Sequence, residues 1–455
     1  MKKIFIIIII AIFSLNACEE GFLDLAPHDE ANVGNFYKNA NDFNTALIAA
    51  YAKLQSEVDI YFEMVEYRSD NIELSAPTAG TQDRYNLDKF QETSANGILL
   101  DAWAIYYNGI LRCNEVISRL ESKDFSAKDQ YDGEARFLRA LTYFNLVRFF
   151  GKVPIILEPV SPEEALSIGR SEVSKVYESI EDDLLKAISQ LPASYSGEDV
   201  GRATSGSAKA LLGKVYLTQK KYSEAKSTLD QLLGAYSLQN SVADVFSVTN
   251  KMNSEIIFAI RFNKEVIDEG HGDWFTISDV SISPITEVLK NAYDASDDRK
   301  NLIEYTQLGA AFKLKKFYDE SSATTKKVGN DYIILRYADV LLMYAEALNE
   351  IGYNASGDAF KYLNEVHERA GLSALTSTDL HDQTTFRNAI LKERQLEFPF
   401  EGHRWFDLVR TGTAKSEMSK NGIDVDEFRY IFPVPQTEIE KMNNKDIFDQ
   451  NPGYN

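Results

Sequence analysis

Apolar residues recur every three or four positions along most of the chain, the spacing that gathers them on one face of an α-helix. This pattern predicts helices over the segments 43–54, 103–120, 134–150, 176–191, 207–219, 222–233, 334–351, 360–370 and 386–398. Strand-like runs are few and short, and the main one covers residues 255–262. The chain is therefore predicted to be mostly α-helical, with long loops.

The predicted helices also show signs of a repeat. In the segment 212–229, residue types at five positions match the core of a tetratricopeptide repeat: Leu212, Gly213, Tyr216, Ala225 and Leu229. The small Gly213 and Ala225 allow two antiparallel helices to approach closely, and the larger side chains fill the groove between them. Lys209 occupies a position where the repeat prefers tryptophan, so the match is incomplete.

Three more helix pairs follow the same logic. They combine residues 334–351 with 360–370, 139–143 with 184–192, and 43–54 with 103–120. Because fewer than three stacked repeats rarely bury a sufficient core, four pairs predict a repeat-built scaffold. Two long insertions, residues 56–100 and 263–331, lack a helical period and are rich in turn-forming polar residues. Loops held on a rigid scaffold are common sites of ligand contact.

The N-terminus has the pattern of a secretion signal. Two lysines precede the apolar run IFIIIIIAIFSL, which is shorter than the ~20 residues of a membrane span. The run leads into LNAC (15–18), which resembles a bacterial lipobox and predicts that Cys18 is lipidated and becomes the first mature residue. Glu19 and Glu20 resemble a signal that sends lipoproteins to the cell surface. The alternative is an ordinary signal peptide with a chance cysteine.

Composition restricts the partners. The chain carries 48 Lys and Arg against 69 Asp and Glu, a net charge of −21 that becomes −23 once a leader with Lys2 and Lys3 is removed. Such a charge repels nucleic acids and anionic phospholipids, which argues against a nucleic-acid partner and favours a neutral or cationic ligand. With Cys18 acylated, Cys113 has no disulfide partner, so the fold must be stabilised by its core.

The stretch PFEGHRWFDLVR (399–410) gathers side chains that general acid–base catalysis uses. Just before it, Glu393 and Glu397 share a helix face, whereas the carboxylates of a glycosidase normally face each other across a cleft. Three basic residues lie close enough in sequence to neutralise these acids: Arg387, Lys392 and Arg394. No nucleophile motif or zinc pattern accompanies the stretch. It is therefore predicted to be structural, in a protein that is not an enzyme and needs no cofactor.

Two other features could have either a structural role or a ligand-binding role. The segment NAYDASDDRKN (291–301) could suggest a calcium loop, but it lacks the ligand spacing of an EF-hand, so its aspartates are predicted to form turns and helix caps and no metal site is expected. Trp103 and Trp405 lie in apolar helical patterns and are predicted to be core. Trp274 lies in a polar loop and is a candidate for binding.

Four long motifs occur in order along the chain: EARFLRALTYFNLVRFFGKVPI (134–155), LRYADVLLMYAEALNE (335–350), ERQLEFPFEGHRWFDLVRTG (393–412) and YIFPVPQTEIEKMNNKDIFDQNPGYN (430–455). A shorter one, GFLDLAP (21–27), follows the predicted lipid cysteine. Together they resemble the RagB/SusD family of outer-membrane lipoproteins over nearly the whole mature chain. Pro399 stands where a small apolar residue would be more typical, at a predicted helix end that tolerates proline.

The resemblance implies a mostly α, SusD-like fold in which tetratricopeptide-like helix pairs form a right-handed scaffold with long loop insertions. It implies a lipoprotein anchored in the outer membrane and exposed at the cell surface, which binds oligosaccharides and delivers them to a SusC-like TonB-dependent transporter. The expected division is a signal peptide (1–17), an N-terminal part (18–240) and a C-terminal part (241–455). The alternative is a tetratricopeptide-type envelope adaptor that binds proteins or peptides, which the repeats alone would permit.

The glycan contacts are expected in the two insertions, which interrupt helix pairs and are predicted to meet over one end of the scaffold. An aromatic ring suits the flat C–H face of a pyranose, while acids and amides bind its hydroxyls. Trp274 and Tyr85 are therefore predicted to stack on sugar, and Asp70, Asn71 and Asp273 to bind hydroxyls. The alternative for Trp274 is that it only fills its own loop.

Overall fold

The computed structural model describes residues 36–77, 80–266, 276–277, 285–308, 311–319 and 329–454. Eight of its helices form the four predicted pairs: α2 (Ala40–Gln55) with α5 (Gly97–Leu120), α6 (Lys128–Phe150) with α8 (Val173–Gln190), α9 (Ser205–Thr218) with α10 (Tyr222–Leu229), and α13 (Tyr337–Ile351) with α14 (Asp358–Arg369). The members of each pair pack on each other, so the four pairs predicted from periodicity are confirmed.

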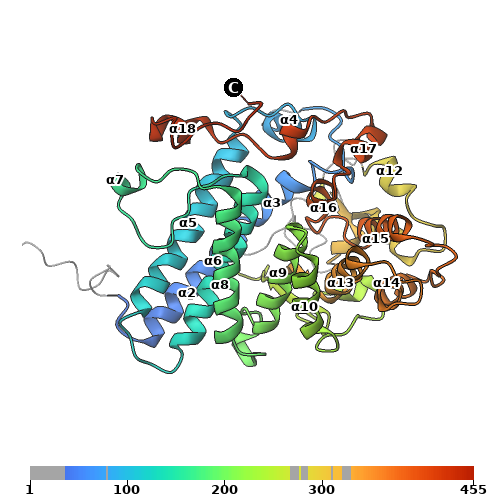
Figure 1. The fold of residues 1–455 in the computed structure, drawn as a ribbon, viewed down its shortest axis with the longest axis horizontal. Helices are drawn as coiled ribbons and strands as arrows, with labels where there is room; N and C mark the ends of the chain where they lie inside the picture. Colours follow the sequence, from blue (N-terminus) through green and yellow to red (C-terminus); the bar gives the residue numbers. More distant parts are fainter. Residues whose placement is uncertain are drawn as a thin grey trace, which may run out of the picture.

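The pairs are stacked in chain order. Helix α5 packs on α6, α8 on α9, and α10 on α13, and α15 (Gln383–Glu397) then packs on α13 and α14. Figure 1 shows the long helices α2, α5, α6 and α8 at one end, α13 to α15 at the other, and α9 and α10 between them. The mostly helical fold expected from the sequence is therefore the observed one.

Close approach within the third pair depends on Gly213. A Cβ atom at this position would lie 2.4 Å from Cδ2 of Leu229 on the facing helix, so any larger residue would push α9 and α10 apart. Ala225 and Leu229 are both buried in this contact. The role expected for the small residue in the repeat pattern is confirmed.

The strands form two small sheets. One pairs β1 (Ile256–Ile260) with β5 (Tyr332–Arg336), and the other has the order β2 (Thr276–Ile277), β4 (Ala311–Leu314), β3 (Tyr305–Leu308). Both are antiparallel. The prediction of helix from residue 334 onward was wrong for its first turn, because Ile333 and Leu335 pair with Ala259 and Phe258 of β1 instead. Helix α13 begins only at Tyr337.

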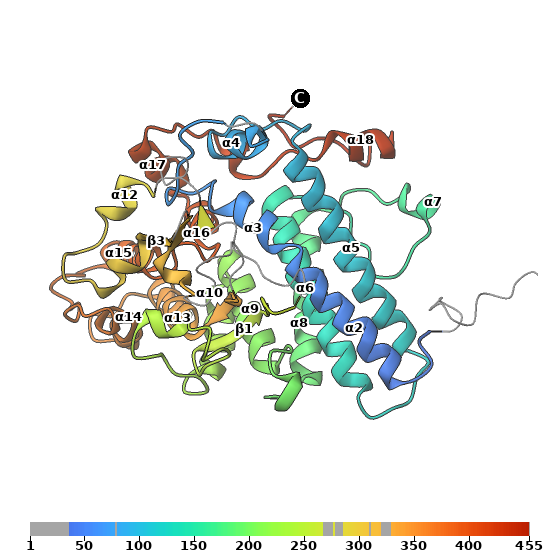
Figure 2. The ribbon, with the colours of Figure 1, turned by 180° about the vertical axis from the view of Figure 1, so that it is seen from behind.

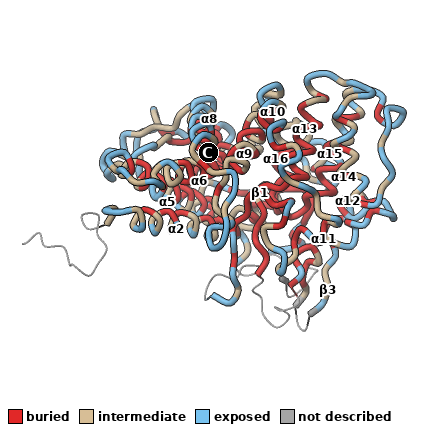
Figure 3. Tube along the Cα trace, turned by 90° about the horizontal axis from the view of Figure 1, so that it is seen from below, coloured by how far each residue is buried: buried red, intermediate tan, exposed pale blue. Residues whose placement is uncertain are grey.

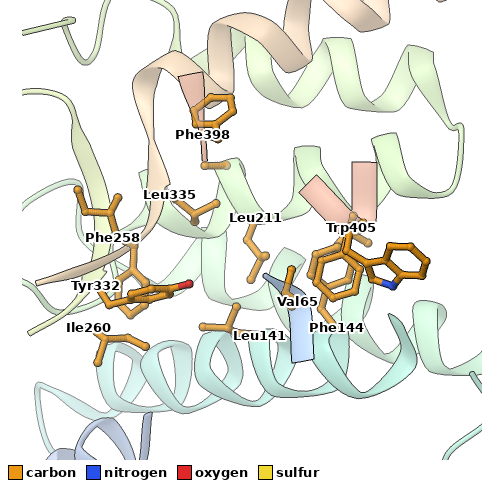
Figure 4. Close-up of a cluster of buried hydrophobic side chains, with 14 of the residues drawn as sticks. Val65, Leu141, Phe144, Leu211, Phe258, Ile260, Tyr332, Leu335, Phe398 and Trp405 are labelled. Carbon is orange, nitrogen blue, oxygen red and sulfur yellow. The ribbon is translucent and has the colours of Figure 1, made fainter. Parts of the chain in front are cut away.

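The core runs between the helix pairs and the first sheet. Figure 4 shows side chains from α6, α9, β1, β5 and the C-terminal region meeting there, among them Phe144, Leu211, Phe258 and Trp405. All four are buried. Figure 3 shows the buried trace continuing from one end of the molecule to the other. Among the described residues, no helix is both long enough and apolar enough to span a bilayer.

Shorter helices complete the structure: α3 (Val58–Val65), α4 (Gln82–Asp88), α7 (Pro162–Ala165), α11 (Val242–Val245), α12 (Glu287–Lys290), α16 (Arg404–Thr411), α17 (Ala414–Met418) and α18 (Gln436–Met442). Helices α4, α12, α17 and α18 lie along one edge of the molecule (Figures 1 and 2). The insertion 56–100 was predicted to lack helical period, yet it contains α3 and α4. Both are too short for the pattern to be recognised.

Candidate functional site

The two long insertions meet in the structure, as predicted. Ile72 of the first forms an antiparallel bridge with Ile285 of the second. Beside it, the amide of Thr286 donates to the carbonyl of Asn71 over 3.0 Å, and the Thr286 hydroxyl donates to the carbonyl of Asp70 over 2.6 Å. Because these contacts engage the backbone of segments more than 200 residues apart, they hold the two insertions against each other.

Asp70 and Asn71, predicted to bind sugar hydroxyls, are instead part of this junction. Both residues are 0% exposed. The two carboxylate oxygens of Asp70 each accept a 2.7 Å hydrogen bond from the guanidinium of Arg404, and the Asn71 amide donates to Glu66. The prediction of direct ligand contact was therefore wrong for these two residues: a buried carboxylate needs a partner, and the protein itself provides it.

Tyr85 lies on α4 at the edge formed by the insertions. Its side chain is half-buried against the core, and the ammonium of Lys89 lies 5.7 Å from the centre of its ring. Lys89 in turn pairs with Glu73 at 2.8 Å and with Asp88 at 2.9 Å. A tyrosine ring bordered by charged, partly exposed groups can offer a sugar both an apolar face and hydrogen-bonding partners.

Arg84, next to Tyr85, connects α4 to residues that lie near the second insertion. Its guanidinium pairs with Glu63 of α3 at 2.5 Å and lies 5.7 Å from the centre of the Tyr67 ring. Burial raises the pKa of Tyr305 on β3, and the neighbouring Tyr67 raises it further. Arg84, Glu63, Tyr67 and Tyr305 thus link α4 to α3 and to the second sheet; Glu63 and Tyr67 are buried, so they support the surface around Tyr85 from below. The sequence gives no periodic signal for this group, because its members come from four separate elements.

Asp83 holds α4 in place. One of its carboxylate oxygens accepts from the amide of Gly97 at 2.9 Å, and its carbonyl accepts from the side chain of Asn96 at 3.0 Å. A carboxylate at the start of α5 also interacts favourably with the helix dipole. Asp83 therefore serves to anchor the helix that carries Tyr85.

Three predicted residues lie outside the described part of the chain. These are Trp274, Asp273 and Cys18. The first described residues after Trp274 are Thr276 and Ile277 of β2, which pair with Lys313 and Phe312 of β4. The predictions for Trp274, Asp273 and Cys18 therefore stay predictions.

The stretch 399–410, which resembles an acid–base site, is a buried ion-pair network. Arg336, at the end of β5, binds three carboxylates: Glu255 at 2.9 Å, Glu397 at 2.6 Å and Glu401 at 2.7 Å. Lys316 adds a 2.6 Å contact to Glu401. Although burial acts to raise the pKa of Glu397, the guanidiniums of Arg369, Arg336 and Arg299 hold it well below its usual range. Burial likewise acts to raise the pKa of Glu401, but Arg336 and Lys316 lower it, so Glu397 and Glu401 stay ionised and paired, which suits a scaffold.

The acids on α15 were predicted to be neutralised by neighbours in sequence, and this was wrong. Glu393 and Glu397 both bind Arg299, at 2.6 and 3.0 Å, and Glu393 also contacts His367 at 2.8 Å. The three nearby basic residues have other surroundings: Arg387 pairs with Glu350, Arg394 with Asp339 and Asp407, and Lys392 faces a pocket. Residues adjacent on a helix point to different faces, so the partners come from distant segments.

His403 is buried beside this network. Its ring stacks on Phe398 with 4.8 Å between centroids, and its Nδ1 atom lies 3.4 Å from both Lys214 and Arg394. Burial, followed by the charge of Lys214, lowers the pKa of His403 to about 3. The neutral imidazole therefore packs and accepts hydrogen bonds within the core.

The predicted structural roles of the aspartates at 294 and 297 and of two tryptophans are confirmed. Asp297 caps the helical turn at 298–303, and Asp294 accepts from the amide of Ser296 in a turn. Trp103 and Trp405 are buried. The Cys113 thiol is buried too, which raises its pKa to about 12. Within the described ranges, no three His, Cys, Asp or Glu side chains are grouped so as to hold a metal ion.

Comparison with known proteins places both halves of the chain in one family. The model of the SusD family matches residues 286–454, and the model described as "Starch-binding associating with outer membrane" matches residues 21–217. SusD-like protein P25 of Formosa agariphila is 26% identical, covering 97% of this chain and 94% of that protein. A SusD-like protein of Bacteroides ovatus is 28% identical, covering 90% and 82% respectively.

Solved structures agree with this assignment. A laminarin-binding SusD-like protein is 30% identical, with a TM-score of 0.77 over 92% of this chain and 100% of that one. Surface glycan-binding protein A from Bacteroides thetaiotaomicron, solved with laminarihexaose, shares the fold with a TM-score of 0.76 at 23% identity, over 90% of this chain and 99% of that one. Helix pairs, insertions and motifs thus have a common explanation: the chain belongs to the SusD family.

Proposed function

We propose that this protein binds oligosaccharides, without cleaving them, on the surface where its two insertions meet. The observation that carries the proposal is the junction of Ile72 with Ile285, which joins the insertions into one surface bearing Tyr85 and Arg84. The laminarin-binding relative, of which this chain covers the full length, supports a glycan as the ligand. So does the family model that describes starch binding.

Tyr85 is the described residue best suited to contact a sugar ring. Its phenol offers a flat apolar face, and Lys89, Glu73 and Arg84 supply charged groups around it. Trp274 and Asp273 of the second insertion are proposed to complete the site, with Trp274 as a second stacking platform. The pattern of one or two rings surrounded by polar groups is the usual way in which proteins hold saccharides.

We propose further that Cys18 carries the lipid anchor and that the protein delivers its glycan to a SusC-like TonB-dependent transporter in the outer membrane. A surface binder without a pore cannot import its ligand, so it needs such a partner. The family description, which associates it with the outer membrane, supports this location. The two matched regions lie on either side of the proposed boundary between residues 240 and 241.

The second candidate is a tetratricopeptide-type envelope adaptor that binds proteins or peptides. The stacked helix pairs would permit it, because such stacks form binding surfaces for extended partners in many proteins. The inserted loops and the laminarin-binding relative favour the glycan.

A panel of neutral and charged polysaccharides, tested with the purified protein by affinity electrophoresis and calorimetry, decides between the candidates. For a glycan that binds, Tyr85→Ala and Trp274→Ala should each weaken affinity about tenfold, because ring stacking and the lost buried area together contribute roughly 1.5 kcal/mol. Tyr85→Phe retains the ring and should retain most of the affinity.

Melting curves of all variants provide the control for folding. Affinity unchanged in Tyr85→Ala and Trp274→Ala would remove these residues from the site. A protein that binds no polysaccharide of the panel, but captures a peptide or an envelope protein, would establish the adaptor instead.

A further inference from the structure

A polar pocket, separate from the surface around Tyr85, lies beside the junction of the insertions. It has a volume of about 460 Å³, within the range of small-molecule sites, and lies between α12, α15 and α17. These three helices are neighbours in both Figure 1 and Figure 2. Helix α12 begins directly after Thr286, and the pocket reaches Arg404, which binds Asp70. The pocket is therefore linked to the junction of the insertions through Arg404, which binds Asp70, and through α12, which follows Thr286.

The walls of the pocket follow from helix geometry. Helix α15 contributes four residues at spacings that place them on one face: Asn388, Leu391, Lys392 and Gln395. From α12 come the apolar Val288 and, at its end, the amide of Asn291. An apolar patch bordered by amides matches the mixed surface of a sugar, with its C–H face and its hydroxyls.

The charge of the pocket is opposite to that of the whole protein. Lys392, Lys420 and Arg404 face Glu417, with Asp70 behind Arg404. Lys420 and Arg404 already share Glu417, at 2.6 and 3.4 Å. Lys392 makes no ion pair with any residue that the structure describes. A chain with a net charge of −21 thus keeps an excess of positive charge in one cavity, where the ammonium of Lys392 has no ion-pair partner among the described residues.

Electrostatic repulsion acts on Lys392 directly. Partial burial, and then the charges of Arg404 and Lys420, lower its pKa to about 8, against the smaller opposing effects of Asp70 and Glu417. At neutral pH the ammonium is still largely protonated, so an anion placed beside it would relieve the repulsion and gain charge-assisted hydrogen bonds.

We infer that this pocket receives an anionic group, a carboxylate or a sulfate ester, carried by an acidic sugar. Lys392 and Lys420 bind the anion, Asn291 and Asn388 bind neighbouring hydroxyls, and Val288 and Leu391 contact the ring. The inference rests on the proposed function for its saccharide, and it makes the ligand class an acidic or sulfated glycan in place of the neutral or cationic ligand that net charge alone suggested.

The first test observes Lys392 itself by NMR of ¹³C-methylated lysines, with the signal assigned from Lys392→Gln. Glucuronate and galactose 6-sulfate are added separately, with glucose and inorganic sulfate as controls. We expect at least one acidic sugar to raise the pKa of Lys392, and glucose to leave it unchanged. No response to either acidic sugar overturns the inference. If inorganic sulfate raises the pKa of Lys392 as much as the acidic sugars do, the pocket binds anions without recognising the sugar, and the claim that it takes a saccharide is overturned.

The second test compares an oligogalacturonate with its carboxyl-reduced form, and a sulfated galactan oligosaccharide with its desulfated form, by calorimetry. Lys392→Gln should weaken binding of the charged member about tenfold and spare the uncharged one. Lys415→Gln, an equal change of charge on α17 outside the pocket, is the matched control. If glycans bind through Tyr85 and show no preference for the charged member, the inference is overturned but the proposed function still holds. If no saccharide binds in either test, both the inference and the proposed function are overturned.

Discussion

Arg404 and His403 are adjacent in the chain and both buried, but they are stabilised in opposite ways. Arg404 stays charged because Asp70 takes two of its hydrogen bonds. His403 stays neutral because it is buried, and because the charges of Lys214 and Arg394 lie beside it. Each arrangement stabilises a polar side chain that is buried away from water. Disturbing the two arrangements is expected to have different effects on the stability of the protein.

Arg404→Ala should lower the free energy of unfolding by about 3–5 kcal/mol, because it leaves the buried carboxylate of Asp70 without its main partner. Urea denaturation followed by circular dichroism measures the change. The control is Lys441→Ala, which breaks an exposed pair with Glu438 and should cost about 0–1 kcal/mol. Equal, small losses in both variants would show that the Arg404–Asp70 pair does not hold the junction together.

His403 should make the protein sensitive to acid. In the unfolded chain an imidazole takes up a proton as the pH falls through about 6.5, whereas folded His403 does so only near pH 3. Between these values the unfolded state binds more protons, so stability falls on acidification by about 1.4 kcal/mol per pH unit from this group. His403→Gln removes the effect, so the stability advantage of the wild type over this variant should shrink from pH 7 to pH 5.

Urea denaturation at several pH values measures this difference. His381→Gln, at a site whose side chain is 66% exposed, is the control for losing an imidazole elsewhere. A difference between wild type and His403→Gln that stays constant from pH 7 to pH 5 would show that His403 titrates in the folded protein much as it does in the unfolded chain.

At the scale of elements, the fold depends on how closely paired helices approach. The contact of α9 with α10 is the tightest example, because Gly213 leaves no room for a side chain against Leu229. In α5, by contrast, a Cβ at Gly109 would meet its nearest neighbour, Glu57, at an ordinary 3.4 Å. Two glycines in buried helices thus have different reasons to be there.

Gly213→Ala should destabilise the protein by about 1–3 kcal/mol through overpacking, despite the better helix propensity of alanine. The double variant with Leu229→Ala should lose less than the sum of the two single variants, because the smaller side chain makes room for the new methyl group. Gly109→Ala is the matched control and should be neutral or slightly stabilising. Strict additivity in the double variant would rule out the proposed clash.

At the scale of the whole molecule, four stacked helix pairs hold two insertions, whose helices α4 and α12 lie along one edge (Figure 2) and which are joined by the bridge of Ile72 with Ile285. The pocket with Lys392 reaches Arg404, which pairs with Asp70, the residue next to Asn71 in the junction of the insertions. One extended glycan could bind across the surface around Tyr85 and the pocket around Lys392. Because the rigid helix stack holds both in place beforehand, little free energy would be spent on ordering them when the glycan binds.

If Cys18 is lipidated as proposed, Cys18→Ala should release the protein from the outer membrane, because it removes the acyl chains, each of which contributes ~0.8 kcal/mol of anchoring energy per buried CH₂. Membrane fractionation and labelling with a fatty acid measure the change. With Cys18 intact, gentle detergent extraction should recover a β-barrel transporter together with the protein. A variant that stays in the membrane fraction and still incorporates the label would refute the assignment of Cys18.

The sequence by itself determined the elements that depend on local pattern. Apolar spacing located the paired helices, because periodicity reports which face of a helix is buried. Gly213 and Ala225 indicated a close helix contact for the same local reason. The buried state of Trp103 and Trp405 followed from their apolar helical surroundings. The start of α13 was missed, since Ile333 to Leu335 have a buried pattern that fits a helix or a strand equally well.

Only the tertiary structure decided what the charged residues do. The partners of Asp70 and Glu397 come from segments up to hundreds of residues away: Arg404 for Asp70 and Arg299 for Glu397. An acid in a polar loop can face solvent or anchor a junction, and its neighbours in sequence do not distinguish the two. Burial turned Asp70 from a predicted ligand contact into a structural anchor, because an ion removed from water is stable only beside an opposite charge.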